Sequence, residues 1–376
     1  MAPSAHRRAA SPPPGRVRIV ADYVTQRGGA ERVNLAFHEA CPGSALTTSF
    51  YDQAHTYPEF GRVVIEASRF NRFPRLRRAH RAAFPIYPFR FGLLRVDNPV
   101  VICSTTGWSH WVRARGRKVV YWHAPARWLY QTDAYTGATG LAARAVGLVA
   151  PFLRRWDRAA TASADVHLCN STEIANRLRR IYGIEAEVLP PPHGMDPDAP
   201  REATPGLEPG FHLCVSRLLP YKNVEAVVAA FEHLPDERLV VVGEGPGRRA
   251  LEQARPPNVE LYSNLTDARL RWLYANCQAL VAASYEDFGL TPLEAGSFGR
   301  PTIALRWGGF LDTVEPGLSG LYFDQPTADR IAQAVKEGVS HEWDTQAIKA
   351  HAATFNAANF RARVLEVVQA QLADCA

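Results

Sequence analysis

The feature that most constrains the fold is a regular alternation of short apolar runs with segments of helical periodicity. After the first run, Val33, Ala36, Phe37 and Ala40 recur at spacings that place them on one face of a helix. Strands that alternate with helices are typical of a parallel β-sheet covered by helices. The sequence therefore predicts an α/β fold. In the first half, the expected strands are residues 17–21, 44–50, 63–67, 100–104, 118–122, 166–169 and 187–189.

The second half repeats this alternation after a proline-rich segment at residues 190–197. Prolines at that density continue neither a helix nor a central strand, and 376 residues exceed one ordinary domain. The expected strands of this half are residues 211–216, 239–242, 259–262, 279–283 and 301–304. We therefore predict a disordered tail over residues 1–15, an N-terminal domain over 16–192, a C-terminal domain over 193–355, and a last helix over 356–376 that packs back toward the N-terminal domain.

The composition limits the classes of partner that the protein can bind but does not select one of them. The net charge of +6 fits nucleotide phosphates, an acidic membrane surface or nucleic acid, but no nucleic-acid-binding signature accompanies the charge. The six cysteines lack metal-site spacing, and most lie in apolar runs, which predicts buried thiols in a reducing compartment. The sequence contains no apolar run of about 18 residues, the length needed to span a membrane. Its first residues lack the apolar core of a signal peptide. These features predict a cytoplasmic protein of the size of an enzyme.

The residues that can carry chemistry follow the expected strands, whose carboxyl ends meet at the edge where such sheets bind ligands. Gly28 and Gly29 follow the first strand, where small residues let a ligand approach the backbone. His123 follows the strand over residues 118–122. Taken singly, the glycine pair is a weak signal that a tight turn also explains, and a lone histidine is more often structural than catalytic.

Two cations follow the strand over residues 211–216. Arg217 and Lys222 are five apart, and two fixed cations there suit a diphosphate whose charge they neutralise. The alternative is a pair of solvated surface charges. Asp196 and Asp198 spell Asp-x-Asp, a metal motif of another fold, but they lie in the proline-rich segment and we expect them to be coincidental.

Glu286 and Glu294 lie eight apart in the segment after the strand over residues 279–283. Thr291, Pro292 and Glu294 predict a capping box, with Thr291 as N-cap and Pro292 at the first helical position. As a cap, the Glu294 carboxylate points back to the backbone of Thr291; as a ligand group, it points into a site. From this pair alone, the simpler interpretation is a cap at Glu294 and a solvated loop carboxylate at Glu286. The ligand role of Glu294 is favoured only when the other motifs below are added, since Pro292 and the Thr291 hydroxyl already support the helix start.

Five ordered motifs resemble the retaining glycosyltransferases of family 4. They are the glycine loop at residues 28–33, the aromatic–His–x–Pro–x–Arg segment at 121–128, the Arg and Lys at 217 and 222, the Gly-Glu-Gly-Pro loop at 243–246, and the paired glutamates at 286 and 294. The second motif resembles a subgroup with many polysaccharide mannosyltransferases. The resemblance covers nearly the whole chain after the tail. It implies the GT-B fold, in which two facing Rossmann-like domains with parallel sheets enclose an interdomain cleft.

The resemblance also implies roles for individual residues. Arg217 and Lys222 hold the donor diphosphate, and Glu294 holds the ribose hydroxyls. His123 touches the donor sugar near the anomeric carbon, and Glu286 lies beside the sugar hydroxyls. The residues expected along the rest of the donor are Gly28 and Gly29 near the phosphate and acceptor, Gly243 and Glu244 on the nucleotide side, and Phe288, Gly289, Leu290 and Thr291 near sugar and phosphate.

These roles predict transfer of a hexosyl unit, with retention, from a GDP- or UDP-sugar to a hydroxyl of a glycan, glycolipid or small molecule, with no metal and no cofactor. Glu286 is not assigned as a nucleophile. A GT-B-fold sugar-nucleotide epimerase and a non-catalytic sugar-nucleotide-binding module remain alternatives. Trp122 and Ala124 depart from the subgroup pattern, so the sugar and acceptor stay open. Trp108, Trp111 and Trp128 join Trp122 in offering stacking surfaces for a sugar or an apolar acceptor.

Residues 69–95 mix arginines with aromatic side chains. A basic amphipathic surface that sits on anionic lipid has this composition, which predicts peripheral contact at the inner face of a membrane. An ordinary solvated helix followed by a proline-rich turn explains the same residues.

Overall fold

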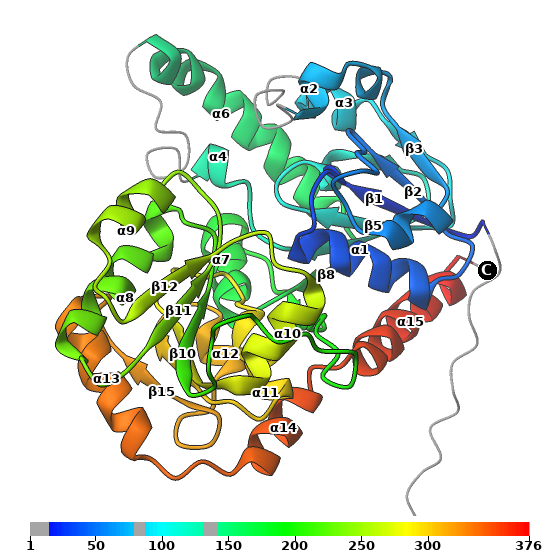
Figure 1. The fold of residues 1–376 in the computed structure, drawn as a ribbon. Coiled ribbons are helices and arrows are strands. Elements are labelled where there is room, and N and C mark those ends of the chain that lie inside the picture. Colours follow the sequence, from blue (N-terminus) through cyan, green and yellow to red (C-terminus); the bar gives the residue numbers. More distant parts are fainter. Residues whose placement is uncertain (1–14, 79–86, 131–140, 376) are drawn as a thin grey trace, which may run out of the picture. The chain divides into compact units, whose positions relative to one another are not determined.

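The computed structural model describes residues 15–78, 87–130 and 141–375. The expected tail lies outside these residues, apart from Gly15, as do residues 79–86 of the arginine- and aromatic-rich segment. The chain forms two compact units, each described here by itself (Figure 1). Unit 1 comprises Met1–Pro191 and Ala357–Ala376, and unit 2 comprises Pro192–Asn356.

Unit 1 is built on a seven-stranded parallel sheet in the order β3-β2-β1-β5-β7-β8-β9. Every strand expected in this half is present: β2, β3 and β9 are shorter than expected by one to three residues, and β5 and β7 are longer by one. The strands are β1 (Val17–Ala21), β2 (Ala45–Thr48), β3 (Ile65–Ala67), β5 (Val100–Thr105), β7 (Arg117–Trp122), β8 (Val166–Cys169) and β9 (Glu187–Val188), with β4 (Arg95–Val96) and β6 (Arg113–Ala114) paired separately.

Both faces of this sheet are covered, because alternate strand residues enter two different hydrophobic cores. Ile19 and Tyr121 enter the core beneath α1 and α15, whereas Val20 and Trp122 enter the core beneath α3, α6 and α7. The helical segments of unit 1 are α1 (Gly29–Ala40), η1 (Pro58–Arg62), η2 (Arg69–Arg72), α2 (Pro74–Arg78), α3 (Tyr87–Gly92), η4 (Ser109–Trp111), α4 (Arg127–Tyr130), α6 (Leu141–Ala162), α7 (Thr172–Tyr182) and α15 (Ala357–Ala373).

The last helix, α15, belongs to unit 1 although it follows unit 2 in the chain (Figure 1). Phe360 packs on Phe37 of α1, with ring centroids 5.6 Å apart. Arg363 holds the Glu187 carboxylate through two nitrogens, at 2.6 and 2.8 Å. An apolar contact and a bidentate ion pair thus fix this helix to the N-terminal sheet.

Three of the tryptophans expected to offer stacking surfaces are core residues instead. Trp108, Trp111 and Trp122 are 4%, 2% and 0% exposed and lie in the core beneath α6. The stacking hypothesis is wrong for these three, because β7 and η4 direct them inward. The side chain of Trp128 lies outside the described part of the structure.

The buried Trp122 creates a testable dependence of stability on pH. Its indole Nε1 donates to His167 Nδ1 at 3.2 Å, and burial lowers the pKa of His167 to about 4. Between pH 6.5 and 4 the unfolded chain therefore binds a proton at His167 that the folded chain excludes, so stability falls as pH falls.

We expect His167→Phe to be less stable than the parent at pH 7, because the indole N–H loses its acceptor. The variant lacks this titration. The excess of the parent's free energy of unfolding over that of the variant should therefore shrink by about 2 kcal/mol as the pH falls from 7 to 4.5. Urea unfolding at the two pH values measures it, and a difference that does not change with pH contradicts the expectation.

Unit 2 is a six-stranded parallel sheet in the order β12-β11-β10-β13-β14-β15. Five strands were expected, and β15 at the edge was missed. The strands are β10 (Phe211–Val215), β11 (Leu239–Val242), β12 (Val259–Tyr262), β13 (Cys277–Ala282), β14 (Thr302–Leu305) and β15 (Gly320–Phe323). The helical segments are η5 (Pro220–Lys222), α8 (Val224–Ala230), η6 (Phe231–His233), α9 (Arg248–Ala254), α10 (Asp267–Asn276), α11 (Thr291–Ser297), α12 (Phe310–Thr313), α13 (Ala328–Ser340) and α14 (Thr345–Ala353).

The prediction of buried thiols is confirmed for five of the six cysteines. All six are free, and only Cys375 is exposed. Within the described residues, no helix combines the length and the apolar character needed to cross a bilayer.

Candidate functional site

The strand order of unit 2 reverses between β10 and β13, and their carboxyl ends meet where such sheets bind ligands. The loop after β10 carries Arg217 and Lys222, and the loop after β13 carries Glu286. Two hydrogen bonds join these loops: Asn223 Nδ2 donates to Ala283 O at 2.8 Å, and Tyr285 N donates to Tyr221 O at 3.2 Å. The topology thus brings together two groups of residues more than sixty positions apart.

Lys222 and Glu286 form an ion pair at this edge. The Lys222 ammonium donates to Glu286 Oε1, and the Ser284 hydroxyl donates to the same oxygen at 3.3 Å. Lys222 is only 7% exposed, and its Nζ lies 5.0 Å from the centre of the Tyr221 ring. A buried ammonium is costly unless it is paired, so Glu286 supplies the counter-charge here.

Arg217 is exposed and lies beside this pair. Its Nη2 donates to the Tyr221 hydroxyl at 3.0 Å, so one tyrosine contacts both cations. The resulting edge presents an exposed guanidinium and a nearly buried ammonium, with a single carboxylate on the ammonium. A bound anion can contact the first directly and compete with Glu286 for the second.

The Gly-Glu-Gly-Pro loop after β11 packs directly on the loop that carries Arg217. Gly243 N donates to Tyr262 O at 3.0 Å, and the Glu244 carbonyl accepts from Leu218 N at 2.8 Å. A Cβ at Gly243 would lie 1.9 Å from the Ser216 carbonyl oxygen. Glycine is therefore required here by the close approach of the two loops. The Glu244 side chain is exposed.

A second glycine loop, which follows β14, contacts the backbone of Glu286. Gly309 N donates to the Glu286 carbonyl at 3.0 Å, and a Cβ at Gly309 would lie 2.1 Å from Phe288 Cα. Gly289 has a φ of +84°, so the chain turns sharply between Phe288 and α11. Leu290 is the N-cap of that helix and Thr291 is its first residue.

The predicted capping box is wrong. Helix α11 begins at Thr291, Leu290 occupies the N-cap position, and no side chain caps it. Instead, Glu294 Oε2 accepts from the Tyr274 hydroxyl of α10 at 2.7 Å. Tyr274 is fully buried, and a buried phenol needs an acceptor. Burial first, and then the Glu294 carboxylate, raise the pKa of Tyr274 well above its usual range.

Because Tyr274 holds the Glu294 carboxylate, we expect Tyr274→Phe to reduce nucleotide affinity about threefold to tenfold, on the scale of one ordinary hydrogen bond, since the substitution acts on the nucleotide only through Glu294. Glu294→Ala, which removes the carboxylate itself, should reduce it further. Calorimetric titration of both variants with UDP and GDP measures the order. A larger loss in Tyr274→Phe than in Glu294→Ala would contradict the assignment of Glu294 as the ligand.

In unit 1, the predicted residues occupy the carboxyl edge of adjacent parallel strands. His123 directly follows β7, and its Nε2 lies 2.8 Å from the Ser104 hydroxyl at the end of β5. Asn170 Nδ2 donates to the His123 carbonyl at 3.1 Å. Burial lowers the pKa of His123 to about 4, so the imidazole is neutral at pH 7. Gly28 is the N-cap of α1 and Gly29 its first residue.

Several residues at these edges were missed by the sequence analysis. Asp22 follows β1 and is 4% exposed; its carboxylate accepts from Thr106 N at 2.7 Å and Ser109 N at 2.5 Å. Its signal is a carboxylate directly after a strand. Gly308 and Gly309 form a glycine pair after β14, as Gly28 and Gly29 do after β1. Tyr274 had no sequence signal, because its partner lies twenty residues away.

The Asp-x-Asp segment forms a local turn. Asp196 Oδ1 accepts from the backbone N–H of Asp198 at 3.0 Å, and both aspartates belong to an exposed stretch of unit 2. This bond is the ordinary one of an Asx turn.

The C-terminal half of the chain is similar to known glycosyltransferases. Residues 197–355 match the family model described as glycosyl transferases group 1. The chain is 33% identical over 178 residues to a glycogen synthase of Thermus thermophilus, covering 40% of each chain, and 33% identical over 146 residues to a glycogen synthase of Pseudomonas aeruginosa, covering 36% of this chain and 28% of that one. The chain thus spans less than half the length of these curated relatives.

Similar solved structures extend over almost the whole chain. HepE of Anabaena, crystallised with UDP, superposes with a TM-score of 0.70 at 14% identity, covering 94% of this chain and all of that one. Sucrose-phosphate synthase of Thermosynechococcus elongatus superposes with a TM-score of 0.68 at 18% identity, covering 96% of this chain and all of that one. The chain therefore has the GT-B glycosyltransferase fold, and its residues 197–355 match the glycosyl transferases group 1 model.

Proposed function

We propose that this protein is a retaining glycosyltransferase of family 4 that moves a hexosyl unit from a nucleotide diphosphate sugar to an acceptor hydroxyl. The observation that carries the proposal is the pairing of Lys222 with Glu286, beside Arg217, at the strand reversal of a group 1 domain. Two cations at this edge match the charge of a diphosphate.

The donor diphosphate displaces the Glu286 carboxylate from Lys222 when it binds. In the absence of ligand, Glu286 neutralises the Lys222 ammonium. Phosphate oxygens then contact Arg217 and Lys222, which releases the Glu286 carboxylate to accept hydrogen bonds from the sugar hydroxyls. Charge that builds up on the departing diphosphate is neutralised by the same two cations, the role that a metal ion plays in other transferases.

The other proposed donor contacts lie on the loops of unit 2. Glu294, held by Tyr274, accepts from the ribose hydroxyls. Gly243 and Glu244 line the nucleotide side, and the backbone of residues 288–291 approaches the sugar and the β-phosphate.

His123 of unit 1 contacts the donor sugar near the anomeric carbon. Its neutral ring, hydrogen-bonded to Ser104, offers a fixed polar contact without a charge. No carboxylate is assigned as a nucleophile; the acceptor attacks from the face that the diphosphate leaves. Catalysis then rests on positioning and on stabilisation of the diphosphate.

UDP-sugars and GDP-sugars are the donors to test first. HepE of Anabaena was crystallised with UDP-glucose, and the segment at residues 121–128 favours a mannosyl donor. The acceptor is a hydroxyl of a glycan, a glycolipid or a small molecule.

The test is incubation with UDP-glucose, UDP-galactose, GDP-mannose and GDP-glucose, each with glycan and lipid acceptors, followed by NMR of the product linkage. The proposal predicts acceptor-dependent release of nucleoside diphosphate and an α-linked product from an α-linked donor. A β-linked product overturns retention. Conversion of the donor sugar without any acceptor identifies the epimerase instead, and binding without turnover identifies the non-catalytic module.

A further inference from the structure

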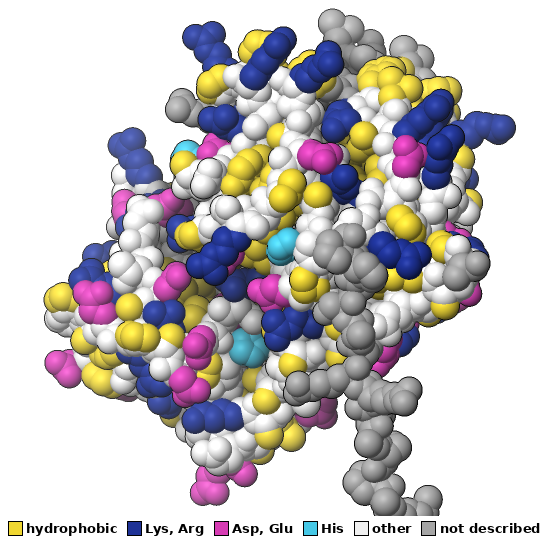
Figure 2. All heavy atoms as spheres, turned by 90° about the vertical axis from the view of Figure 1, so that its right-hand side faces the viewer, with side chains coloured by type: hydrophobic (Ala, Val, Ile, Leu, Met, Phe, Trp, Pro, Cys, Tyr) yellow, Lys and Arg dark blue, Asp and Glu magenta, His cyan; other side chains and the backbone are white. Residues whose placement is uncertain are grey.

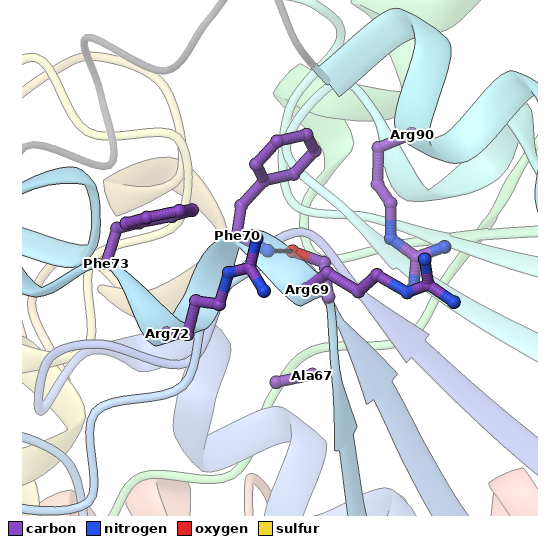
Figure 3. A pocket seen from close by; sticks show the side chains of 7 residues that line it. Ala67, Arg69, Phe70, Arg72, Phe73 and Arg90 are labelled. Carbon is purple, nitrogen blue, oxygen red and sulfur yellow. Dashed lines mark hydrogen bonds between the residues drawn. The ribbon is translucent and has the colours of Figure 1, made fainter.

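A pocket of about 500 Å³ lies on unit 1, outside the strand edge that carries His123. It is lined by Ala67, Ser68, Arg69, Phe70, Arg72, Phe73 and Arg90. Three arginines and no acid thus line one concave surface. Figure 3 shows the guanidinium groups of Arg69, from η2, and Arg90, from α3, pointing toward one another.

The pocket has a fixed backbone. Ser68 caps η2: its hydroxyl accepts from Phe70 N at 3.2 Å and donates to the Ser49 carbonyl at 2.8 Å. Arg72 stacks on the neighbouring Phe73, with its guanidinium carbon 4.9 Å from the ring centre. The positions of Arg69, Arg72 and Phe73 are therefore set by a capped turn joined to the β-sheet.

The positive charge of this pocket is not neutralised within the described residues. Arg90 Nε is buried without a hydrogen-bond partner there, and none of the three arginines donates to a carboxylate. Glu66 favours the charged form of Arg90 electrostatically, but its carboxylate is in contact with Arg18, at 2.7 Å. Converging guanidinium groups repel one another, so an anion in the pocket relieves a cost that the empty pocket carries.

Apolar side chains surround the pocket and are exposed. Phe70 and Phe73 are 39% and 44% exposed, Phe89 on α3 is 64% exposed, and Leu93, directly after α3, is 67% exposed. The neighbouring α6 adds Phe152, also 67% exposed. Figure 2 shows Lys and Arg side chains among hydrophobic ones over this end of unit 1, where Figure 1 draws α2 and α3.

Helices α3 and α6 form one continuous surface. Gly92 of α3 lies against the Trp156 ring of α6, since a Cβ there would be 2.0 Å from Trp156 Cζ2. Phe152 and Trp156 also line a second hollow, with Arg155. Basic and aromatic groups thus line one hollow between η2 and α3 and another on α6, which packs against α3.

We propose that this face binds the surface of a bilayer containing anionic phospholipid, and that the pocket of Arg69, Arg72 and Arg90 holds a headgroup phosphate. Guanidinium groups match phosphate oxygens in charge and geometry. The exposed phenylalanines enter the boundary between headgroups and acyl chains, where aromatic rings partition. A discrete phosphate site distinguishes this proposal from attraction by net charge, and it does not depend on the donor chemistry in unit 2.

Co-sedimentation with phosphatidylcholine vesicles, with and without phosphatidylglycerol, tests the proposal. Binding should require phosphatidylglycerol and weaken as NaCl is added. The variant Arg69→Gln/Arg72→Gln/Arg90→Gln should bind about a hundredfold more weakly, at about fivefold for each arginine near an anionic surface. Phe89→Ser should weaken binding several-fold at unchanged charge.

Matched controls separate the pocket from net charge. The pair Arg69→Gln/Arg72→Gln is compared with Arg330→Gln/Lys336→Gln, two exposed cations on α13 of unit 2. The control pair should change vesicle binding less than twofold. Equal losses in both pairs overturn the discrete site. Circular dichroism melts establish that each variant is folded.

A soluble source of the phosphate is distinguished by a second arm. Glycerol 1-phosphate and inorganic phosphate are titrated into the protein and into Arg90→Gln. Binding of the soluble phosphates, lost in Arg90→Gln and accompanied by no vesicle binding, overturns the lipid assignment. No binding to anionic vesicles at low salt overturns it as well.

Discussion

Lys222→Met is expected to abolish most sugar transfer. Lys222 is the nearly buried cation at the strand reversal of unit 2, and it lies where a diphosphate would meet it. The substitution keeps the apolar stem of the side chain and removes only the charge. We expect nucleotide affinity to fall about thirtyfold, the scale of a lost bond between charged groups, and kcat to fall by roughly 10² to 10³.

The effect on rate should exceed the effect on affinity, because charge on the diphosphate increases as the glycosidic bond breaks. Lys336→Met provides the control, since Lys336 is an exposed lysine of the same unit on α13. Steady-state kinetics and nucleotide titration of both variants measure the difference. A Lys222→Met enzyme with unchanged kcat and affinity would remove Lys222 from the site.

Glu286→Gln should separate nucleotide binding from transfer. The Glu286 carboxylate pairs with the Lys222 ammonium, the group that we propose contacts the donor diphosphate. The amide keeps the shape of the side chain and removes its negative charge. We therefore expect UDP or GDP to bind about threefold to tenfold more tightly, because the phosphate no longer competes with a carboxylate.

Transfer by the same variant should fall about a hundredfold, because the sugar hydroxyls lose a charged acceptor. Glu342→Gln, at an exposed acid of unit 2, serves as the control for a change of one charge. Weaker nucleotide binding in Glu286→Gln would show that Glu286 positions Lys222 for the donor and does not compete with it.

The convergence of Arg217, Lys222 and Glu286 was predictable from sequence. Each follows an apolar run of strand length, and parallel strands beside a strand reversal bring such positions to one edge. The ion pair itself was not predictable. The end of a strand fixes where the backbone lies, whereas the approach of Lys222 to Glu286 also depends on the two hydrogen bonds that Asn223 and Tyr285 make between the loops.

Glu294 shows where local pattern fails. The spacing of Thr291, Pro292 and Glu294 matches a capping box, but a tertiary contact with Tyr274 takes the carboxylate. A buried hydroxyl on a neighbouring helix outweighs a local backbone bond, and no spacing rule describes that neighbour. The tryptophans of unit 1 are a second case in which tertiary structure decides. Their number suggested a binding surface, but the direction of its strand places Trp122 in the core.

Strand β15 was missed for a simpler reason. Residues 320–323 read Gly-Leu-Tyr-Phe, a short run that opens on glycine and lies at the edge of the sheet. Glycine is depleted in strands, and Tyr322 is held by its hydroxyl, which donates to the carbonyls of Phe310 and Val314. Pairing with β14 supplies the regularity that the sequence lacks.

Release of nucleoside diphosphate tests the central claim most directly. The parent protein and Lys222→Met are incubated side by side with each UDP- and GDP-hexose and with a mixture of glycan and lipid acceptors, and the UDP or GDP formed is quantified. We predict acceptor-dependent release from at least one donor by the parent, and release at least a hundredfold lower by Lys222→Met, on the scale expected for loss of one charge-stabilising group. No release from any donor, or equal release by the two proteins, would contradict sugar transfer at this site.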